Sequence, residues 1–244
     1  MSLTVQDTIY AVEKTKVEPF TFDEEVVAVF PDMIARSVPG YTLLLPLIGQ
    51  IASRYAQPYS RCYDLGCSLG AVTLALRQQI AVPDCRITAV DNSAAMIEQC
   101  GRILARSGRG VPVDLVEADI CQIPINQASV VVLNFTLQFV APSQRDGLIQ
   151  RIYDGLLPGG VLILSEKVLF EPPALNERLV TLHHDFKREN GYSDLEISQK
   201  RTALENVLIS ETVPQHQGRL QRAGFASAEV WFQAFNFVSL LALK

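Results

Sequence analysis

The sequence has no hydrophobic run long enough to cross a membrane as a helix. Its longest apolar stretches, Leu43–Ile51 and Val130–Ala141, are interrupted by polar or helix-breaking residues and fall short of the roughly 18 apolar residues that a span needs. Charged side chains between Asp7 and Glu18 occupy the region where a signal peptide would be apolar. We therefore expect a cytoplasmic protein without a membrane partner.

The chain is also poor in cysteine and histidine. Its five cysteines are odd in number and never spaced as C-x-x-C, which argues against a disulfide framework and against a zinc ribbon. No cluster of Cys or carboxylate residues accompanies His183, His184 or His216, the only histidines, at metal-ligand spacing. We expect no metal site and reduced cysteines, most of them in the core.

An excess of basic residues is missing as well. The 21 Lys and Arg residues face 26 Asp and Glu residues, which gives a formal net charge of −5. Proteins that grip a phosphate backbone rely on clustered cations, so direct nucleic-acid binding is disfavoured. No repeat or Gly/Ser-rich linker divides the 244 residues, and the 48% hydrophobic content is that of a globular chain, so we expect a single domain over 1–244.

From residue 61 onward, short β-branched runs alternate with helical patterns, which is typical of a parallel sheet flanked by helices. The runs that predict its strands are Arg61–Leu65, Arg86–Val90, Val113–Glu117, Val130–Phe135 and Val161–Ser165. Two further runs, Ala228–Phe232 and Phe237–Ala242, are joined by only four residues, too few to cross over between parallel strands. The sheet is therefore expected to end in an antiparallel hairpin.

Cap residues predict several helix starts. Asn92-Ser93 precedes an apolar stripe of helical period, Ser143 with Asp146 is read as a capping box, and so is Thr21 with Glu24. Gly224 marks a helix end.

Two stretches lie outside the minimal βαβ plan. An N-terminal segment, 1–58, is expected to cover the sheet, and a charged insertion at about 169–214 has helical patterns over Leu175–Asn190 and Leu195–Ile209. An insertion after a strand's carboxyl end lies where open α/β sheets bind ligands.

The segment Tyr63–Gly70 reads YDLGCSLG and joins a predicted strand to a helix, so its glycines can bring backbone N–H groups and the helix N-terminus to a ligand. Asp91 ends the next strand, in the position of an acceptor for ribose hydroxyls. By itself the loop could be an ordinary tight turn, but the two features together predict a nucleoside site.

Two polar residues extend this site along the sheet edge. Asp119 follows the third strand and is either a ligand contact or a turn cap. Asn134 ends the fourth strand after an apolar run, and burying its amide without a partner would cost about 1–3 kcal/mol. We therefore interpret Asn134 as a site residue.

The D-x-G-x-x-x-G loop, the acidic end of the second strand and the terminal hairpin resemble the class I S-adenosylmethionine-dependent methyltransferases. The implied fold class is α/β: a Rossmann-like, mostly parallel seven-stranded sheet with a terminal antiparallel hairpin and a helical insertion. Ser68 stands where that family has a middle glycine, which would add a hydroxyl near the methionyl end. Nicotinamide dehydrogenases use a similar loop but continue with parallel strands.

A narrower resemblance covers nearly the whole chain. It rests on the segments TFDE at 21–24, FPDMI at 30–34, RSVPGY at 36–41, HHDFKR at 183–188, GYS at 191–193 and LEISQKR at 195–201, together with the glycine loop and Val132–Phe139. These segments resemble the carboxy-S-adenosyl-L-methionine synthase family.

That resemblance implies conversion of S-adenosyl-L-methionine and prephenate to carboxy-S-adenosyl-L-methionine and phenylpyruvate. The product would supply a tRNA carboxymethyltransferase that modifies wobble uridine, and the enzyme would be a homodimer. The implied ligand contacts are Tyr41, Gly66, Cys67, Ser68, Asp91, Asn92, Asp119, Ile120, Asn134 and Arg201.

No catalytic side chain is assigned. The hypothesis is that hydroxide leaving prephenate, rather than a side chain, removes a proton from the sulfonium methyl, which then captures CO2 in a dry pocket. His183 and His184 are candidates for substrate contact or proton transfer, or else structural histidines, and Arg201 is expected to hold the new carboxylate. The alternatives are an ordinary methyltransferase acting on a small molecule or RNA, and a nucleoside-binding module without catalysis.

Overall fold

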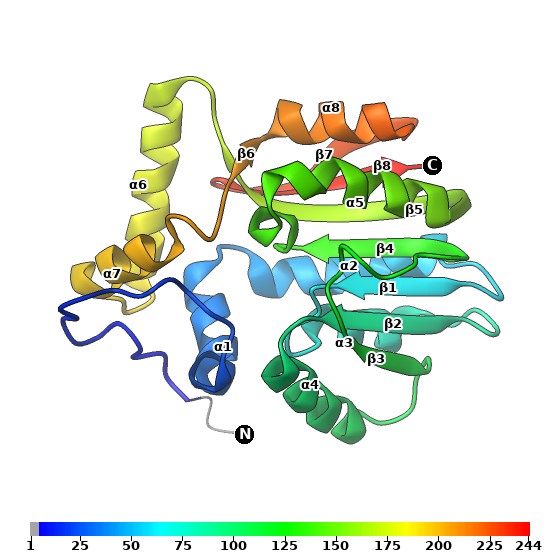
Figure 1. Ribbon diagram of the computed structural model, residues 1–244, viewed down its shortest axis with the longest axis horizontal. Coiled ribbons are helices and arrows are strands. Elements are labelled where there is room, and N and C mark those ends of the chain that lie inside the picture. Colours follow the sequence, from blue (N-terminus) through cyan, green and yellow to red (C-terminus); the bar gives the residue numbers. More distant parts are fainter. Residues whose placement is uncertain (1–4) are drawn as a thin grey trace.

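An open sheet runs through the centre of the molecule in the computed structural model, which describes residues 5–244 (Figure 1). Along the sheet the order is β3-β2-β1-β4-β5-β8-β7. The strands are β1 Arg61–Leu65, β2 Arg86–Asp91, β3 Val113–Glu117, β4 Ala128–Asn134, β5 Leu156–Leu169, β7 Ser227–Ala234 and β8 Phe237–Leu243. Strands β3, β2, β1, β4 and β5 are parallel to one another, whereas β8 runs antiparallel to both β5 and β7. The sheet is therefore that of the class I methyltransferases, as predicted.

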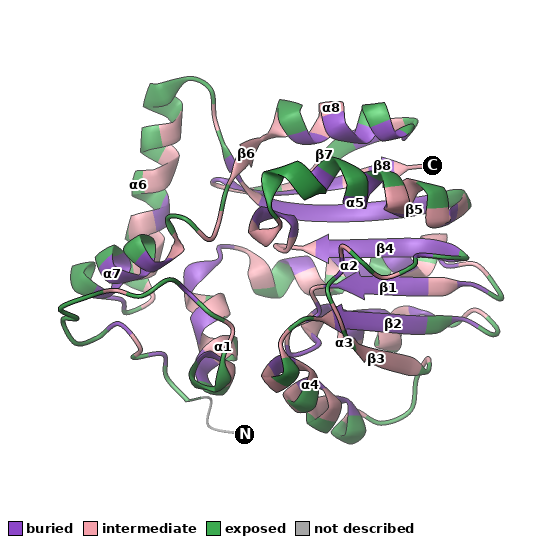
Figure 2. Cartoon of the chain, viewed as in Figure 1, coloured by how far each residue is buried: buried purple, intermediate pink, exposed green. Residues whose placement is uncertain are grey.

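Helices cover both faces of this sheet. The helices that pack on it are α2 Tyr41–Tyr55, α3 Ala71–Gln79, α4 Ala94–Arg106, α5 Pro142–Gly155 and α8 Val213–Ala223. Alternating side chains divide the core in two: Val130 and Val132 of β4 pack with α2 and α3, whereas Val131 and Leu133 pack with α5 and α8. Figure 2 shows the central strands buried along their length. A strand buried on both faces explains why the fourth run is apolar without alternation.

A helical cap stands beyond the carboxyl ends of the parallel strands. It consists of α1 Glu24–Ser37, α6 Pro173–Glu189 and α7 Asp194–Leu204, which Figure 1 shows on the side toward which β4 points. The N-terminal segment crosses α7, where the Gln199 amide donates to the carbonyls of Tyr10 and Val12 at 3.0 and 2.9 Å. The N-terminal segment and the insertion after β5 thus pack against each other. Residues 1–4 of the N-terminal segment lie outside the described residues.

The seven predicted strands are present, and most differ from the prediction only at their ends. The largest difference is in β5, which runs from Leu156 to Leu169 and is therefore longer at both ends than the predicted Val161–Ser165. A register shift against β4 accommodates it. The returning insertion adds a two-residue strand, β6 Glu211–Thr212, that pairs with the end of β5.

Helix starts were predicted with mixed success. Ser93 caps α4 as expected, and its side chain accepts from the Met96 N–H at 3.2 Å. The Thr21–Glu24 box is wrong, because Asp23 is the N-cap of α1.

The capping box of Ser143 and Asp146 is also wrong. Helix α5 already begins at Pro142, whose fixed φ suits a first helical turn, and it has no side-chain cap. The Asp146 carboxylate instead pairs with Arg219 of α8 at 2.6 Å.

Over residues 5–244, we find no helix with both the length and the apolar character of a membrane span. Within the same range, no three Cys, His, Asp or Glu side chains gather as metal ligands would.

Candidate functional site

A cavity of about 540 Å³ lies between the carboxyl ends of the parallel strands and the helical cap. Its volume is in the range of small-molecule sites. The predicted ligand contacts that line it are Tyr41, Gly66, Cys67, Ser68, Asp91, Asn92, Asp119, Ile120 and Asn134. Only Arg201, of the predicted contacts, is not among the lining residues. The sheet edge therefore brings together residues that are separated by more than ninety positions in the sequence.

The loop after β1 is fixed to Asp91 at the end of β2. The Asp91 carboxylate accepts from the Ser68 N–H at 2.9 Å through one oxygen and from the Ser93 N–H at 3.0 Å through the other. Burial raises the pKa of Asp91, and these N–H groups oppose that shift. Each oxygen keeps a free lone pair, so the carboxylate can still accept from a ligand hydroxyl.

Three residues of this loop, Gly66, Ser68 and Gly70, have left-handed backbone conformations. Gly66 has a φ of 81°, and a Cβ there would lie 2.3 Å from the Thr136 side chain, so only glycine fits. Ser68 has a φ of 49°, and its hydroxyl donates to Met96 Sδ at 3.3 Å. Strained backbone of this kind concentrates at ligand sites.

Asp64, which sequence reasoning left out of the site, also lines the cavity. It is 1% exposed and accepts from the Thr73 hydroxyl at 2.6 Å. Burial raises its pKa to about 7. The sequence signal that could have placed Asp64 in the site is its position as the acidic residue of the D-x-G loop.

Asp119 and Asn134 both lie on the wall of the cavity, but their side-chain oxygens differ in hydrogen bonding. Asp119 accepts from the Cys121 N–H at 2.8 Å, so it caps a turn and also faces the cavity. The Asn134 Oδ1 is buried and has no hydrogen-bond partner among residues 5–244. Such an acceptor needs a donor that a ligand can provide.

Part of the cavity lining, which we call the cation–aromatic end, combines aromatic rings with basic side chains. Its members are Tyr41, Phe135, Phe237, His183, Lys167 and Lys187. The Phe135 ring lies 6.4 Å from Tyr41 and 5.7 Å from Phe237, measured between centroids. The His183 ring meets Phe237 edge-on at 4.9 Å.

His183 is a neutral, fixed part of this wall. It is 3% exposed, and its Nε2 donates to the Ser37 carbonyl at 2.8 Å. Burial, reinforced by the charges of Lys187 and Lys167, lowers its pKa to about 2. His184, the next residue, is not among the lining residues.

Three lysines line the cavity, and only one of them has a partner. Lys200 of α7 lies 3.7 Å from the Asp7 carboxylate and 3.2 Å from the Ser37 hydroxyl. The ammonium groups of Lys167 and Lys187 have neither a hydrogen bond nor an ion pair within the described part of the chain. Burial lowers the pKa of both, and for Lys187 the charges of Lys200 and Lys167 help to bring it to about 7.

Arg201 is exposed on α7. Its charge nevertheless contributes to the lowered pKa values of Lys167 and His184.

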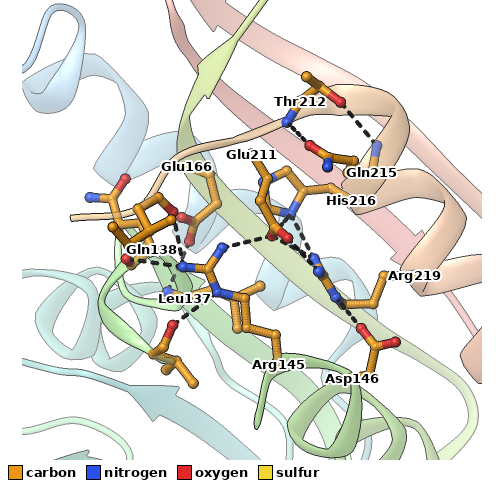
Figure 3. Close-up of polar contacts among 12 residues, drawn as sticks. Leu137, Gln138, Arg145, Asp146, Glu166, Glu211, Thr212, Gln215, His216 and Arg219 are labelled. Carbon is orange, nitrogen blue, oxygen red and sulfur yellow. Dashed lines mark hydrogen bonds and ion pairs between the residues drawn. The ribbon is translucent and has the colours of Figure 1, made fainter. Parts of the chain in front are cut away.

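A buried polar network supports the wall of the cavity behind this end (Figure 3). Arg145, which is fully buried, donates to the Gln138 carbonyl at 3.2 Å and pairs with Glu211 at 2.8 Å. Glu211 in turn pairs with Arg219 at 2.6 Å. The Gln138 side-chain oxygen accepts from the backbone N–H of Lys167 at 3.1 Å. The network thus joins the short helix Leu137–Phe139 (η1) to the end of β5, where Lys167 lies.

Glu166 lies beside this network. It is 1% exposed and accepts from the Leu137 N–H at 3.0 Å. Burial raises its pKa to about 8, so the group is mostly protonated at neutral pH.

Comparison with known proteins agrees with the geometry. A methyltransferase domain family matches residues 63–160. The carboxy-S-adenosyl-L-methionine synthase of Trichlorobacter lovleyi is 62% identical over 239 residues, which cover 98% of each chain.

Two solved structures share the fold. One is a Methanococcus maripaludis protein assigned to the S-adenosyl-L-methionine-dependent methyltransferases, with 23% identity, a TM-score of 0.59 and coverage of 96% and 97%. The other is human N-acetylserotonin methyltransferase in complex with SAM, with 18% identity and a TM-score of 0.59. There the match covers 91% of this chain but only 55% of the human one. Because the identity with the Trichlorobacter protein extends over both full chains, the chain described here belongs to the carboxy-S-adenosyl-L-methionine synthase family.

Proposed function

We propose that the protein is a carboxy-S-adenosyl-L-methionine synthase that takes its carboxyl group from prephenate. The observation that carries this proposal is the 62% identity to a named synthase over 98% of both chains. The cavity adds support, because its two ends differ in chemistry as two dissimilar substrates would require.

In this proposal S-adenosyl-L-methionine binds along the carboxyl ends of β1, β2 and β4. Asp91 accepts from the ribose hydroxyls, and Asp119 with Ile120 lies beside the adenine. The buried, unpartnered Oδ1 of Asn134 accepts from the methionyl ammonium group. Gly66, Cys67 and Ser68 form the backbone surface on which the ligand rests.

The overall reaction balances without an added oxidant or reductant. Prephenate loses its ring carboxylate as CO2 while its ring hydroxyl leaves as hydroxide, and the ring becomes aromatic. Hydroxide takes one proton from the sulfonium methyl and becomes water. The methyl carbon then bonds to CO2, which gives carboxy-S-adenosyl-L-methionine, phenylpyruvate and water.

No side chain of the cavity is needed as the base in this scheme. His183 is held neutral and donates its Nε2–H to the backbone, so its role is to shape the wall. The dry, partly aromatic end would keep water away from CO2 until it is captured.

The decisive experiment uses prephenate that carries ¹³C in its ring carboxylate. The purified protein is incubated with S-adenosyl-L-methionine and this substrate, and the nucleosides are weighed by mass spectrometry. We expect a nucleoside heavier than S-adenosyl-L-methionine by one labelled CO2. Formation of S-adenosylhomocysteine alone would instead indicate an ordinary methyltransferase for a small molecule or RNA.

We further propose that the protein is a homodimer and that its product supplies a tRNA carboxymethyltransferase. With a net charge of −5, the protein itself is expected to have no specific affinity for tRNA at physiological salt. A filter-binding signal that survives excess non-specific competitor would contradict this and would favour the RNA methyltransferase.

A further inference from the structure

The cation–aromatic end contains two positive charges that nothing in the described chain neutralises. Lys167 lies on β5 and Lys187 on α6, where it shares a helix face with His183 four residues earlier. Lys200 in the same cavity differs in having Asp7 and Ser37 as partners, although burial lowers its pKa as well, to about 8. Among the described residues, the charges that act on the other two are positive: Arg201 acts on Lys167, and Lys200 and Lys167 act on Lys187.

Such an arrangement is unfavourable unless an anion binds. Burial and like charges disfavour the ammonium form, and the lowered pKa values of both lysines express that cost. A carboxylate placed between the two would replace the repulsion with charge-assisted hydrogen bonds. The uncompensated pair therefore indicates a site for an anionic ligand.

The surroundings narrow the chemistry of that ligand. The rings of Tyr41, Phe135 and Phe237 lie near one another and line the same cavity as the two lysines, so they offer an apolar surface for a six-membered ring. Phe135 follows the end of β4 with a φ of 60°, and its ring lies next to the rings of both Tyr41 and Phe237. A ring that carries a short acidic side chain matches both features.

Prephenate has two carboxylates, and the lysines suit only one of them. The ring carboxylate becomes neutral CO2, so two cations on it would stabilise the ground state more than the transition state and would slow the reaction. The pyruvyl carboxylate keeps its charge throughout. We propose that Lys167 and Lys187 bind the pyruvyl carboxylate of prephenate, with the ring against Phe135 and Phe237.

This assignment rests on the proposed function, and phenylpyruvate separates the two claims. Phenylpyruvate retains the pyruvyl carboxylate and lacks the ring carboxylate. We would measure its binding, the KM for prephenate and the affinity for S-adenosyl-L-methionine in Lys167→Met, Lys187→Met and the two Lys→Arg variants. Lys16→Met, at an exposed residue paired only with Glu18, is the matched control.

We expect each Met variant to bind phenylpyruvate about tenfold or more weakly and to raise the KM for prephenate similarly. Affinity for S-adenosyl-L-methionine should stay near that of the wild type, and the Arg variants should recover part of the loss. Because each Met variant removes a partly buried charge that has no partner in the described chain, its thermal midpoint should be unchanged or higher. A lysine with a purely structural role would give the opposite shift.

Three results would overturn the assignment. Unchanged phenylpyruvate affinity and KM would remove the lysines from substrate binding. A raised KM with unchanged phenylpyruvate affinity would place them on the ring carboxylate. A lowered thermal midpoint with an equal loss of S-adenosyl-L-methionine affinity would make them structural. Failure of the proposed function looks different, since the wild-type protein itself would form no labelled carboxy-S-adenosyl-L-methionine.

Discussion

The two ends of the cavity differ in whether their charged groups already have partners within the described chain. At the nucleoside end, both oxygens of Asp91 already accept backbone N–H groups, and the Asp64 carboxyl is bonded to Thr73. At the cation–aromatic end, Lys167 and Lys187 have no partner in the described chain. The first end is pre-organised before any ligand binds, whereas the second is complete only with an anion.

The difference follows from where the residues come from in the chain. The nucleoside end is made of local βα turns, whose backbone groups can be satisfied within a few residues. The cation–aromatic end is assembled from β5, α6 and the hairpin, which meet only through tertiary packing. The Arg145 network is one of the few fixed supports behind it (Figure 3).

The largest effect is expected for Arg145→Met. Arg145 is fully buried and also donates to the carbonyls of Val140 and Ile209, both at 2.9 Å, so its removal leaves Glu211 and several carbonyls underpaired. We expect a loss of about 3–5 kcal/mol in the free energy of unfolding, measured with urea. Below the transition, binding of phenylpyruvate should suffer more than binding of S-adenosyl-L-methionine.

Arg222→Met is the control for that variant, because Arg222 is exposed and pairs with Asp146 of the same network. Its unfolding midpoint should stay near the wild-type value. If Arg145→Met unfolds at the same urea concentration as this control, the network does not support the wall.

The next effect concerns Arg201→Ala. If Arg201 holds the added carboxylate in a desolvated contact, its loss should cost about 2–5 kcal/mol in binding carboxy-S-adenosyl-L-methionine, by calorimetry. Binding of S-adenosyl-L-methionine should fall much less. Equal losses for the two ligands would show that Arg201 does not read the new carboxylate.

Because Arg201 is exposed and does not line the cavity of its own chain, we expect it to act across a dimer contact. Mixed dimers of Arg201→Ala and Asp91→Ala chains would then regain a complete site. Mixing that restores no binding of carboxy-S-adenosyl-L-methionine would argue against action in trans.

A smaller effect is expected for Asp91→Ala, which tests the independence of the two ends. Losing a charge-assisted hydrogen bond should weaken S-adenosyl-L-methionine binding by about 1.5–3 kcal/mol. Phenylpyruvate binding should not change, and Glu98→Ala on the exposed face of α4 should alter neither. An equal loss of affinity for both ligands would show that the two ends do not bind independently.

The smallest effect is a pH dependence confined to the cation–aromatic end. With a pKa of about 7, Lys187 is charged below neutrality and loses its proton above it, whereas a bound carboxylate would raise that pKa. Lys200 and Lys167 face it with charges, and His183 stays neutral down to a pH of about 2.

Phenylpyruvate affinity should therefore be flat below pH 7 and fall by up to about tenfold per pH unit above it. Titration calorimetry between about pH 6 and pH 9, a range that brackets the pKa of about 7, measures this loss of affinity. The Lys187→Met variant should lose the fall that begins near pH 7, whereas a fall that begins near pH 8 would belong to Lys200, whose pKa burial lowers to about 8. A wild-type affinity that stays constant across the range would exclude Lys187 from the anion site.

Much of the nucleoside end was predictable from the sequence. The strand pattern, the D-x-G-x-x-x-G loop and Asp91 are local signals, and the fold predicted from them is the one found. Parallel strands bring their carboxyl ends to one edge, so consecutive loop residues had to meet there. The Ser143 and Asp146 box failed because a distant arginine, Arg219, takes the Asp146 side chain.

The sequence by itself thus determined the strands, the terminal hairpin and the nucleoside loop, because these depend on periodicity, turn chemistry and short connections. Only the tertiary structure decided that Lys167 and Lys187, twenty residues apart, face one cavity without partners among residues 5–244, while Lys200 finds Asp7 from the far end of the chain. A lysine looks the same in sequence whether it is solvated or buried. Its charge becomes a binding determinant only when packing excludes water around it and brings other cations near, because an anion then stabilises the charged form.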